Sequence, residues 1–394
     1  MFQPPQTDTL PPQSIDGTSP PARSARPPAR REPSPAPRGT PDSAPDSAAG
    51  GPGSAGGRDP FFDNAKYLAI VLVAMGHTWG PLTTGSRATL ALYLVVYAFH
   101  MPAFIVISGY FSRNFDARPD RVRRLVTGVL VPYVLFETAY GLFRRWAEHD
   151  PSQPISVFDP WYLTWFLIAL FIWRLTSPIW RIVRQPVAVA LVIAAVATTS
   201  AGIEGTLDLP RVLQFLPFFV VGLCAKPEWF HVLRGRRMRL PTALVFAAAL
   251  AAAYWAAPAS TPTWLYHQAS TARLGLPWWT GVVTTVALFA GSLLLTACFF
   301  AWVPRRRTWF TALGAGTLYG YLLHGFVVKT ALSLGWFDRP WVHTPPGRVA
   351  FTLIAGAVVT VLCTPPVQRV FRFAVQPRMA WAFRRTEPVS PGTR

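Results

Sequence analysis

The clearest candidates for chemistry are three ionisable residues in one apolar stretch, FFDNAKYLAIVLVAMGHTWG, at residues 61–80. Lys66 and His77 are 11 positions apart, which on a helix brings them within about 20° of each other and leaves Asp63 within about 60° of both. His77 then stands about 16 Å beyond Lys66 along the axis. We predict one stripe, with an Asp–Lys pair near one end and a proton-accepting imidazole near the other. Alternatively, the Asp63–Lys66 ion pair extends to the membrane surface and His77 lies at the membrane–water interface, without a shared role.

Two more histidines occur inside apolar stretches. His100 lies in YLVVYAFHMPAFIVISGYF, with Tyr97 and Ser108 on roughly the same side of the helix, and His324 in TLYGYLLHGFVVK shares a face with Tyr321. An ionisable group at the bilayer centre costs about 3 kcal/mol on insertion scales, so such residues usually face a partner or a cavity. A histidine satisfied by a neighbouring helix is the alternative. Three histidines on three helices favour proton handling or activation of a nucleophile.

No other catalytic pattern competes in the sequence. It contains no GxSxG, no Walker loop, no HExxH and no GxGxxG that opens a helix. The three cysteines lie in apolar blocks without paired spacing, so neither a disulfide framework nor a metal site is predicted. Glu137, in VPYVLFETAY, is a weaker candidate, for which a hydrogen bond between helices is favoured over catalysis.

Helices of membrane-spanning length must position these residues. The chain has 394 residues, of which 51% are hydrophobic and 14% charged, and the apolar residues gather in blocks of about 17 to 25. We predict an all-α, polytopic membrane bundle of about ten transmembrane helices. The predicted spans are, to within several residues, 61–80, 89–111, 125–143, 161–177, 187–203, 211–225, 241–257, 278–303, 309–332 and 349–367.

The positions of the charged residues predict the topology. Basic residues outnumber acidic ones by 37 to 18. If the N-terminus is cytoplasmic and ten spans alternate, 28 positive residues fall on the cytoplasmic side and seven outside. Because positive charge resists translocation, both termini are predicted to be cytoplasmic, in a multi-pass protein of the cell membrane. The membrane topology then explains most of the net charge of +19, and no nucleic acid partner is expected.

The two ends of the chain differ from the apolar region. Residues 1–58 are dominated by Pro, Ala, Ser, Gly and Arg, which predicts a disordered cytoplasmic tail. No apolar segment lies near Met1, so the first span is expected to act as its own insertion signal. The expected organisation is this tail, a transmembrane domain at residues 59–370, and a basic cytoplasmic tail at 371–394.

Taken in order, these motifs resemble a known family. A basic residue, ten intervening positions and a histidine in the first span, followed by HMPAFIVISGYF, are similar to the integral-membrane acyltransferase family 3. The form FFDNAKYLAIVLVAMGH resembles its branch of fucose 4-O-acetylase-like acetyltransferases. WYLTWFLIALF at 161–171 and YGYLLHGF at 319–326 resemble later landmarks of that branch. The resemblance covers residues 59 to about 367.

The resemblance implies transfer of an acyl group, most often acetyl from acetyl-CoA, to a hydroxyl of a sugar or sugar-bearing acceptor. The catalytic role carries over to His77, and the paired basic position falls on Lys66, where many members have arginine. Asp63 and His100 complete the catalytic candidates. Acyl-CoA is expected as a co-substrate, with no bound cofactor, and the bilayer and a carbohydrate or glycosylated acceptor as partners.

Further binding residues follow from this scheme. The segment RNFDARPDRVRR after the second span is basic enough to hold the phosphates of acyl-CoA, although positive-inside topology alone also accounts for it. Its candidate residues are Arg113, Arg121, Arg123 and Arg124. Candidates for the substrate path are Ser108, Trp165, Tyr321 and His324.

Two other classes of protein remain as alternatives. A proton-coupled transporter that exports a glycan or small molecule also suits ten spans with buried histidine and aspartate, but no internal repeat or matched pair of broken spans supports it. A scaffold without chemistry leaves three histidines within spans unexplained. The sequence leaves the acceptor open between an extracytoplasmic polysaccharide, a lipid-linked glycan and a glycosylated secondary metabolite.

Overall fold

The computed structural model describes residues 59–203 and 205–383. Throughout this part of the chain the regular structure is helical, with α-helices joined by loops and short 3-10 turns, which confirms the predicted all-α class. The predicted tail at residues 1–58 lies outside the described residues. At the other end, α13 (Pro365–Val375) runs across the predicted boundary at residue 370.

Helices occupy all ten positions at which spans are predicted. They are α1 (Pro60–Trp79), α2 (Arg87–Ser112), α3 with α4 (Pro119–Leu125, Val131–Ala147), α5 (Trp165–Ile182), α6 (Pro186–Thr199), α7 (Leu209–Cys224), α9 (Arg239–Ala256), α10 (Trp278–Trp302), α11 (Thr317–Ser333) and α12 (Pro345–Leu362). A turn of π-helix, Val126–Leu130, joins α3 to α4. The short helix α8 (Pro227–Leu233) lies between α7 and α9.

Seven helices in the described part of the chain are long and apolar enough to cross a membrane. The helices α1, α6 and α11 are not among them. Asp63 and Lys66 lower the hydropathy of α1, while α6 and α11 have only 14 and 17 residues. The protein is therefore a helical membrane protein, and the count of ten spans stays a prediction.

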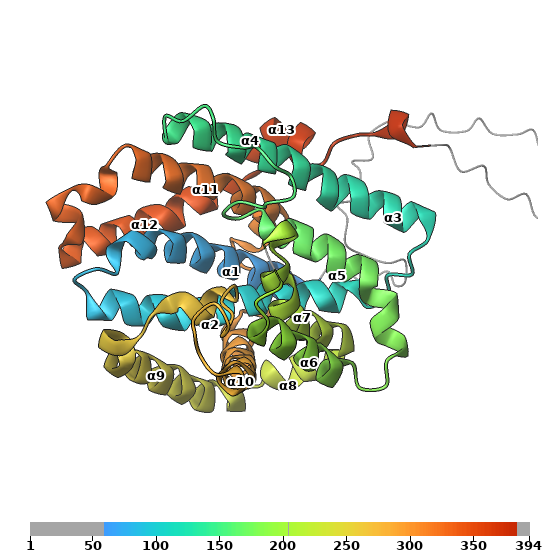
Figure 1. Cartoon of the computed structure of the whole chain (residues 1–394), viewed down its shortest axis with the longest axis horizontal. Coiled ribbons are helices and arrows are strands. Elements are labelled where there is room, and N and C mark those ends of the chain that lie inside the picture. The colour runs from blue at the N-terminus through green and yellow to red at the C-terminus, as the bar shows by residue number, and fades with distance from the viewer. Residues whose placement is uncertain (1–58, 204, 384–394) are drawn as a thin grey trace, which may run out of the picture. The chain divides into compact units, whose positions relative to one another are not determined.

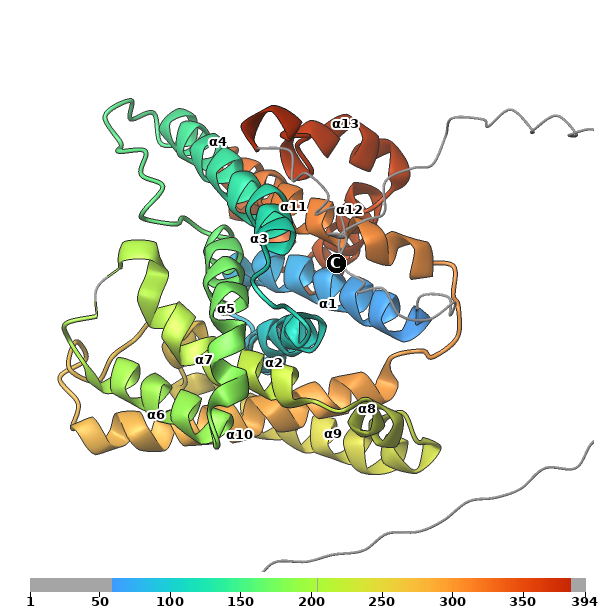
Figure 2. The same ribbon diagram turned by 90° about the vertical axis from the view of Figure 1, so that its right-hand side faces the viewer.

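Helix α1 lies at the centre of the bundle. It packs against α2 on one side and against α11 and α12 on the other (Figures 1 and 2). Helices α7, α9 and α10 contact α2, whereas α4 and α13 contact α11. The residues on α1 therefore face two groups of helices, and the three histidine-bearing helices α1, α2 and α11 are neighbours around this axis.

The N-terminal end of α1 is fastened to the segment that follows α10. Asn64 is fully buried, and its side-chain amide donates to the backbone oxygens of Pro304 and Arg306 at 2.9 and 3.0 Å. Its side-chain oxygen accepts hydrogen bonds from Thr308 and Thr311. All these segments lie on the side predicted to be cytoplasmic, so the contact agrees with the alternating topology.

Contacts at the opposite ends of the helices agree with the same topology. Arg87, before the second span, donates to the backbone oxygen of Trp255 at the end of α9, 3.0 Å away. The hydroxyls of Tyr93 and Tyr266 lie 2.7 Å apart. Segments predicted to share a side of the membrane thus contact one another, while which side is the cytoplasm stays a prediction.

Two glycines let α2 and α7 touch backbone to backbone. A Cβ added at Gly109 would lie 2.2 Å from the backbone oxygen of Phe219, and one at Gly222 would lie 2.2 Å from that of Val106. Both distances are far shorter than a carbon–oxygen contact allows. Any larger residue at Gly109 must therefore separate the two helices.

Candidate active site

His77 is surrounded by aromatic rings from three other parts of the chain. The centroid of its ring lies 4.9 Å from that of Tyr162, 5.6 Å from that of His324 and 6.1 Å from that of Tyr97. Its Nδ1 is 3.5 Å from the Tyr97 hydroxyl, and Tyr97 in turn lies against His100, with ring centroids 4.7 Å apart. The structure therefore brings the three predicted histidines into one cluster.

The hydrogen bonds of His100 and His324 assign their tautomers. His100 Nδ1 lies 2.8 Å from the backbone oxygen of Val96, and His324 Nδ1 lies 2.9 Å from that of Gly320. Since a carbonyl can only accept, each Nδ1 carries a hydrogen and each neutral ring keeps Nε2 as an acceptor. His324 Nε2 is buried and has no partner. It is thus available to receive a proton from a bound molecule.

The segment before α5 supplies a residue that the sequence reasoning missed. Tyr162 has a φ of 59°, a left-handed conformation that is rare for a bulky side chain, and its ring packs against His77. On the same ring, Lys329 Nζ lies 4.6 Å from the centroid. The predicted span at 161–177 therefore begins as a helix only at Trp165. Periodicity could not reveal this turn, although WYLTW was among the landmark motifs.

Glu137 on α4 holds that segment in place. Its carboxylate accepts hydrogen bonds from the backbone N–H of Trp161, at 3.0 and 3.2 Å, and from the Thr164 hydroxyl. Both donors flank Tyr162 in the sequence. The hydrogen bond expected between two helices instead joins α4 to the non-helical segment before α5, and it indicates that Glu137 positions Tyr162 beside His77.

Two basic side chains outside α1 influence His77. Lys329 on α11 and Arg211 on α7 both act on it electrostatically. Arg211 pairs with Asp208 at 2.9 Å, donates to the backbone oxygen of Tyr266 at 3.0 Å, and lies 5.1 Å from the Trp165 ring centroid. A basic surrounding of this kind favours negative charge that develops next to His77.

Lys66 and Asp63 form the ion pair expected at the other end of α1. Lys66 Nζ lies 2.8 Å from Asp63 Oδ1, and both side chains are mostly buried. A Cβ added at Gly314 would lie 2.6 Å from the Asp63 Cβ, so the turn before α11 packs directly on this pair. The pair stands well apart from His77 along the helix, and its catalytic role stays a prediction.

The four arginines predicted to bind acyl-CoA make different contacts. Arg121 is paired with Asp116 at 3.3 Å and donates to the backbone oxygen of Asn114. Arg113 lies over the Tyr110 ring, 4.0 Å from its centroid, and Arg123 lies over Phe383 at 4.8 Å. Arg124 is exposed. Their role in binding stays a prediction.

The candidates for the substrate path fall into two groups. Tyr321 joins the cluster, with its ring centroid 6.2 Å from that of His324 and its hydroxyl bonded to the backbone oxygen of Leu163. Trp165 and Ser108 are more distant from it. Trp165 stacks on Phe215 between α5 and α7, and half-buried Ser108 lies near the other end of α2. Their use by substrate stays a prediction.

A cavity of about 290 Å³ adjoins the cluster at His324. Its walls come from α1, α11, α12 and the loop after α11, and most are apolar. The polar side chains in the wall are Thr78, His324 and Arg339. Thr78 is satisfied by the backbone oxygen of Ala74. We call this cavity the α11–α12 groove.

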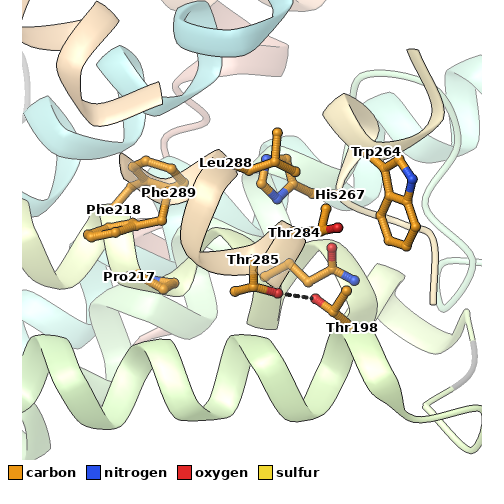
Figure 3. A pocket seen from close by; sticks show the side chains of 10 residues that line it. Thr198, Pro217, Phe218, Trp264, His267, Thr284, Thr285, Leu288 and Phe289 are labelled. Atoms are coloured by element: carbon orange, nitrogen blue, oxygen red, sulfur yellow. Dashed lines mark hydrogen bonds between the residues drawn. The ribbon is translucent and has the colours of Figure 1, made fainter. Parts of the chain in front are cut away.

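A second histidine pocket lies between α6, α7 and α10. His267 is buried there, its ring centroid 4.0 Å from that of Phe215, in a cavity of about 10 Å³ that Trp264, Phe218 and Thr285 also line (Figure 3). Such a cavity has room for about one water molecule. Burial lowers the pKa of His267 to about 3, with a further contribution from Arg211, so the ring is neutral near pH 7. This pocket is too small for a substrate.

The structure defines a helical membrane protein in which three histidines from three helices form one cluster, and a comparison with known families identifies its class. Residues 59–365 match the family model described as an acyltransferase domain, acyltransferase family 3. The chain belongs to this family, so the resemblance to the family is confirmed and the protein is a membrane acyltransferase, while its place in the fucose 4-O-acetylase-like branch stays a prediction.

Two proteins with the printed name nodulation protein NolL are similar to this chain. The one from Mesorhizobium japonicum is 26% identical over 345 residues, which cover 79% of this chain and 87% of the relative. The one from Sinorhizobium fredii is 25% identical over 334 residues, 78% of this chain and 89% of the relative. No solved structure matches the chain significantly.

Proposed function

We propose that the protein transfers an acyl group from cytoplasmic acyl-CoA to a hydroxyl of a carbohydrate or glycosylated acceptor, with His77 as the central catalytic residue. The observation that carries the proposal is the cluster of His77, His100 and His324 in a member of an acyltransferase family. Acetyl is the donor group that the motif resemblance favours.

The reaction needs a proton acceptor. When the acceptor hydroxyl attacks the thioester carbonyl, a carbon–oxygen bond forms, the hydroxyl proton passes to His77, and negative charge develops on the carbonyl oxygen. The carbon–sulfur bond then breaks and the CoA thiolate takes up the proton. In a second route, His77 itself receives the acyl group and then passes it to the hydroxyl. Both routes use the same imidazole.

The surroundings of His77 suit either route. The Tyr97 hydroxyl beside Nδ1 orients the ring and leaves Nε2 for the reacting molecule. Lys329 and Arg211 lower the energy of the developing oxyanion through the apolar interior, where charges are poorly screened. The partnerless Nε2 of His324 provides a second proton acceptor.

Donor and acceptor are proposed to approach from opposite sides. The arginines at residues 113–124 lie at the predicted cytoplasmic face, where acyl-CoA is made, and the pantetheine arm reaches upward toward His77. His77 lies two residues before the end of α1, on the side predicted to be outside. An extracytoplasmic sugar hydroxyl therefore reaches it over a short path.

The donor proposal is tested with the protein in inverted membrane vesicles. Acyl-CoA is added outside the vesicles, and release of CoA thiol is measured with a panel of glycan acceptors. The double variant Arg123→Gln/Arg124→Gln should raise KM for acyl-CoA about tenfold, because charge-assisted phosphate contacts contribute about 1.5 to 3 kcal/mol. Arg144→Gln, in a predicted outer loop, is the matched control. An unchanged KM in the double variant leaves these arginines only a topological role.

The acceptor is sought in cells. Mass spectrometry of envelope glycans and small metabolites from a deletion strain should show one species that has lost an acyl mass, restored by the wild-type gene and not by His77→Ala. Movement of solute by reconstituted protein without acyl-CoA would instead support the transporter alternative.

A further inference from the structure

The α11–α12 groove has a closed end and an open end. At the closed end lie Ala74, Ala355 and His324, which are at most 8% exposed. At the open end lie Trp336 and Trp341, each 54% exposed. A volume of about 290 Å³ is near the lower limit of small-molecule sites, about 300 Å³, and about twice that of an engineered apolar cavity that holds benzene.

The closed end of the groove meets the reaction centre. His324 forms part of the groove wall, and its ring centroid is 5.6 Å from that of His77. Its Nε2 is buried without a partner, in a side chain that is only 1% exposed. A buried acceptor without a partner is unfavourable unless a bound molecule or water satisfies it, so the site is built to receive a ligand.

We propose that the α11–α12 groove binds the hydrocarbon chain of the acyl group that is transferred, so that the enzyme uses medium-chain acyl-CoA as well as acetyl-CoA. This inference rests on the proposed function. The thioester carbonyl lies between His77 and His324, the pantetheine arm runs toward the cytoplasmic side, and the chain extends along α11 toward the open end.

The direction of the groove favours the acyl chain over an apolar part of the acceptor. An acceptor with its tail at the closed end and its polar head at the open end would hold its hydroxyl far from His77. The acyl chain has its reacting carbon at the closed end, where the histidines are.

The length of the groove limits the length of the chain. From His324 to Ala331 the groove follows α11 for about 10 Å. An extended alkyl chain, with bonds of about 1.5 Å, advances about 1.25 Å per bond and fills this length with about eight bonds. An octanoyl group therefore matches the groove, whereas an acetyl group leaves it largely empty.

The test compares the affinities of acetyl-CoA and octanoyl-CoA for full-length protein in nanodiscs, by titration calorimetry, with empty nanodiscs subtracted. Each buried methylene should tighten binding about fourfold, so wild-type protein should bind octanoyl-CoA at least tenfold more tightly. Ala355→Phe places a ring in the groove and should reduce the ratio of the two Kd values to near one. Ala357→Phe, an exposed position on the same helix, should keep the wild-type ratio.

The outcomes separate the two proposals. If both acyl-CoA molecules bind equally to wild-type protein, or if Ala355→Phe and Ala357→Phe change the ratio alike, the groove does not bind the acyl chain, while the donor proposal stands. If neither molecule binds, the acyl-CoA donor and the groove proposal both fail.

A second measurement does not depend on the folding of Ala355→Phe. The open end of the groove contains Trp336 and Trp341, and bromine quenches tryptophan fluorescence at short range. An octanoyl-CoA that is brominated at its last carbon should quench wild-type protein more than the variant Trp336→Phe/Trp341→Phe. Equal quenching of the two proteins overturns the proposal. In a competition experiment, brominated phosphatidylcholine is added first and octanoyl-CoA second. If the lipid quenches Trp336 and Trp341 and octanoyl-CoA does not relieve the quenching, the groove holds a membrane lipid and the acyl-chain proposal is overturned.

Discussion

Two parts of this molecule bury a histidine among aromatic rings, and only one of them is suited to chemistry. His324 and His77 lie beside a groove of about 290 Å³, and His324 keeps a nitrogen without a partner. His267 lies in a cavity of about 10 Å³, with its ring tilted by 36° against that of Phe215. Burial is common to both histidines. What separates them is room for a ligand beside the ring.

The largest expected effect separates His77 from His267. Replacement of His77 by alanine removes the proposed base or acyl carrier and should lower acyl transfer by about a thousandfold, within the range for general acid–base groups. His267→Ala, in contrast, should keep most of the activity. CoA release and the amount of membrane-inserted protein are measured for both variants. A His77→Ala protein that inserts normally and acylates at the wild-type rate refutes the assignment.

A smaller decrease in the rate of acyl transfer is expected when His324 is replaced by alanine. Alanine there removes the second proton acceptor while His77 remains, so the rate should fall about tenfold, below the usual range for the principal base. The pH dependence of kcat/KM distinguishes this role from packing, because loss of a titrating group changes the shape of the profile. A uniform decrease at every pH means that His324 only shapes the cavity.

Variants of Glu137 test whether its carboxylate holds the segment that places Tyr162 beside His77. Glu137→Ala leaves the Trp161 N–H without an acceptor and leaves the Thr164 hydroxyl only the backbone oxygen of Trp161, which should destabilise the protein by about 1 to 3 kcal/mol. Glu137→Gln keeps one acceptor oxygen and should lose less. Melting temperatures of the two variants, read together with kcat, give the comparison. If Glu137→Ala melts like the wild-type protein, the carboxylate does not hold this segment.

The smallest effect concerns pH and His267. Because burial lowers the folded-state pKa to about 3, the unfolded chain takes up the proton first as pH falls below about 6.5. The contribution of the neutral His267 ring to the free energy of unfolding is complete above about pH 6.5 and decreases as the pH falls toward 3. Between pH 7 and pH 5 the melting temperature of wild-type protein should therefore fall more than that of His267→Phe. Parallel curves for the two proteins contradict this.

Spacing predicted the parts of the site that lie on regular helices. The positions of Asp63, Lys66 and His77 on one side of α1 follow from 3.6 residues per turn. The cluster of His77, His100 and His324 could be suspected, since each is an ionisable residue in an apolar span, but its distances depend on which helices are neighbours.

Other parts of the site depend on geometry that periodicity does not contain. Tyr162 reaches His77 through a left-handed turn that follows an otherwise apolar pattern, and Glu137 on another helix holds that turn. The groove is lined by residues of α1, α11, α12 and the loop after α11, and no sequence motif marks it. His267 is a further example. Its burial among aromatic rings depends on the loop that packs over α7, and the sequence alone does not indicate this packing.

The backbone contact between α2 and α7 has a consequence for how the protein moves. With Gly109 and Gly222 pressed together, neither helix can rotate or slide without a clash between main-chain atoms. That half of the bundle behaves as a fixed frame that carries His100. Movement that admits a substrate is then expected in the opposite half, where α11 and α12 border the groove, at a distance from the tight contact between Gly316 and the backbone oxygen of Cys363.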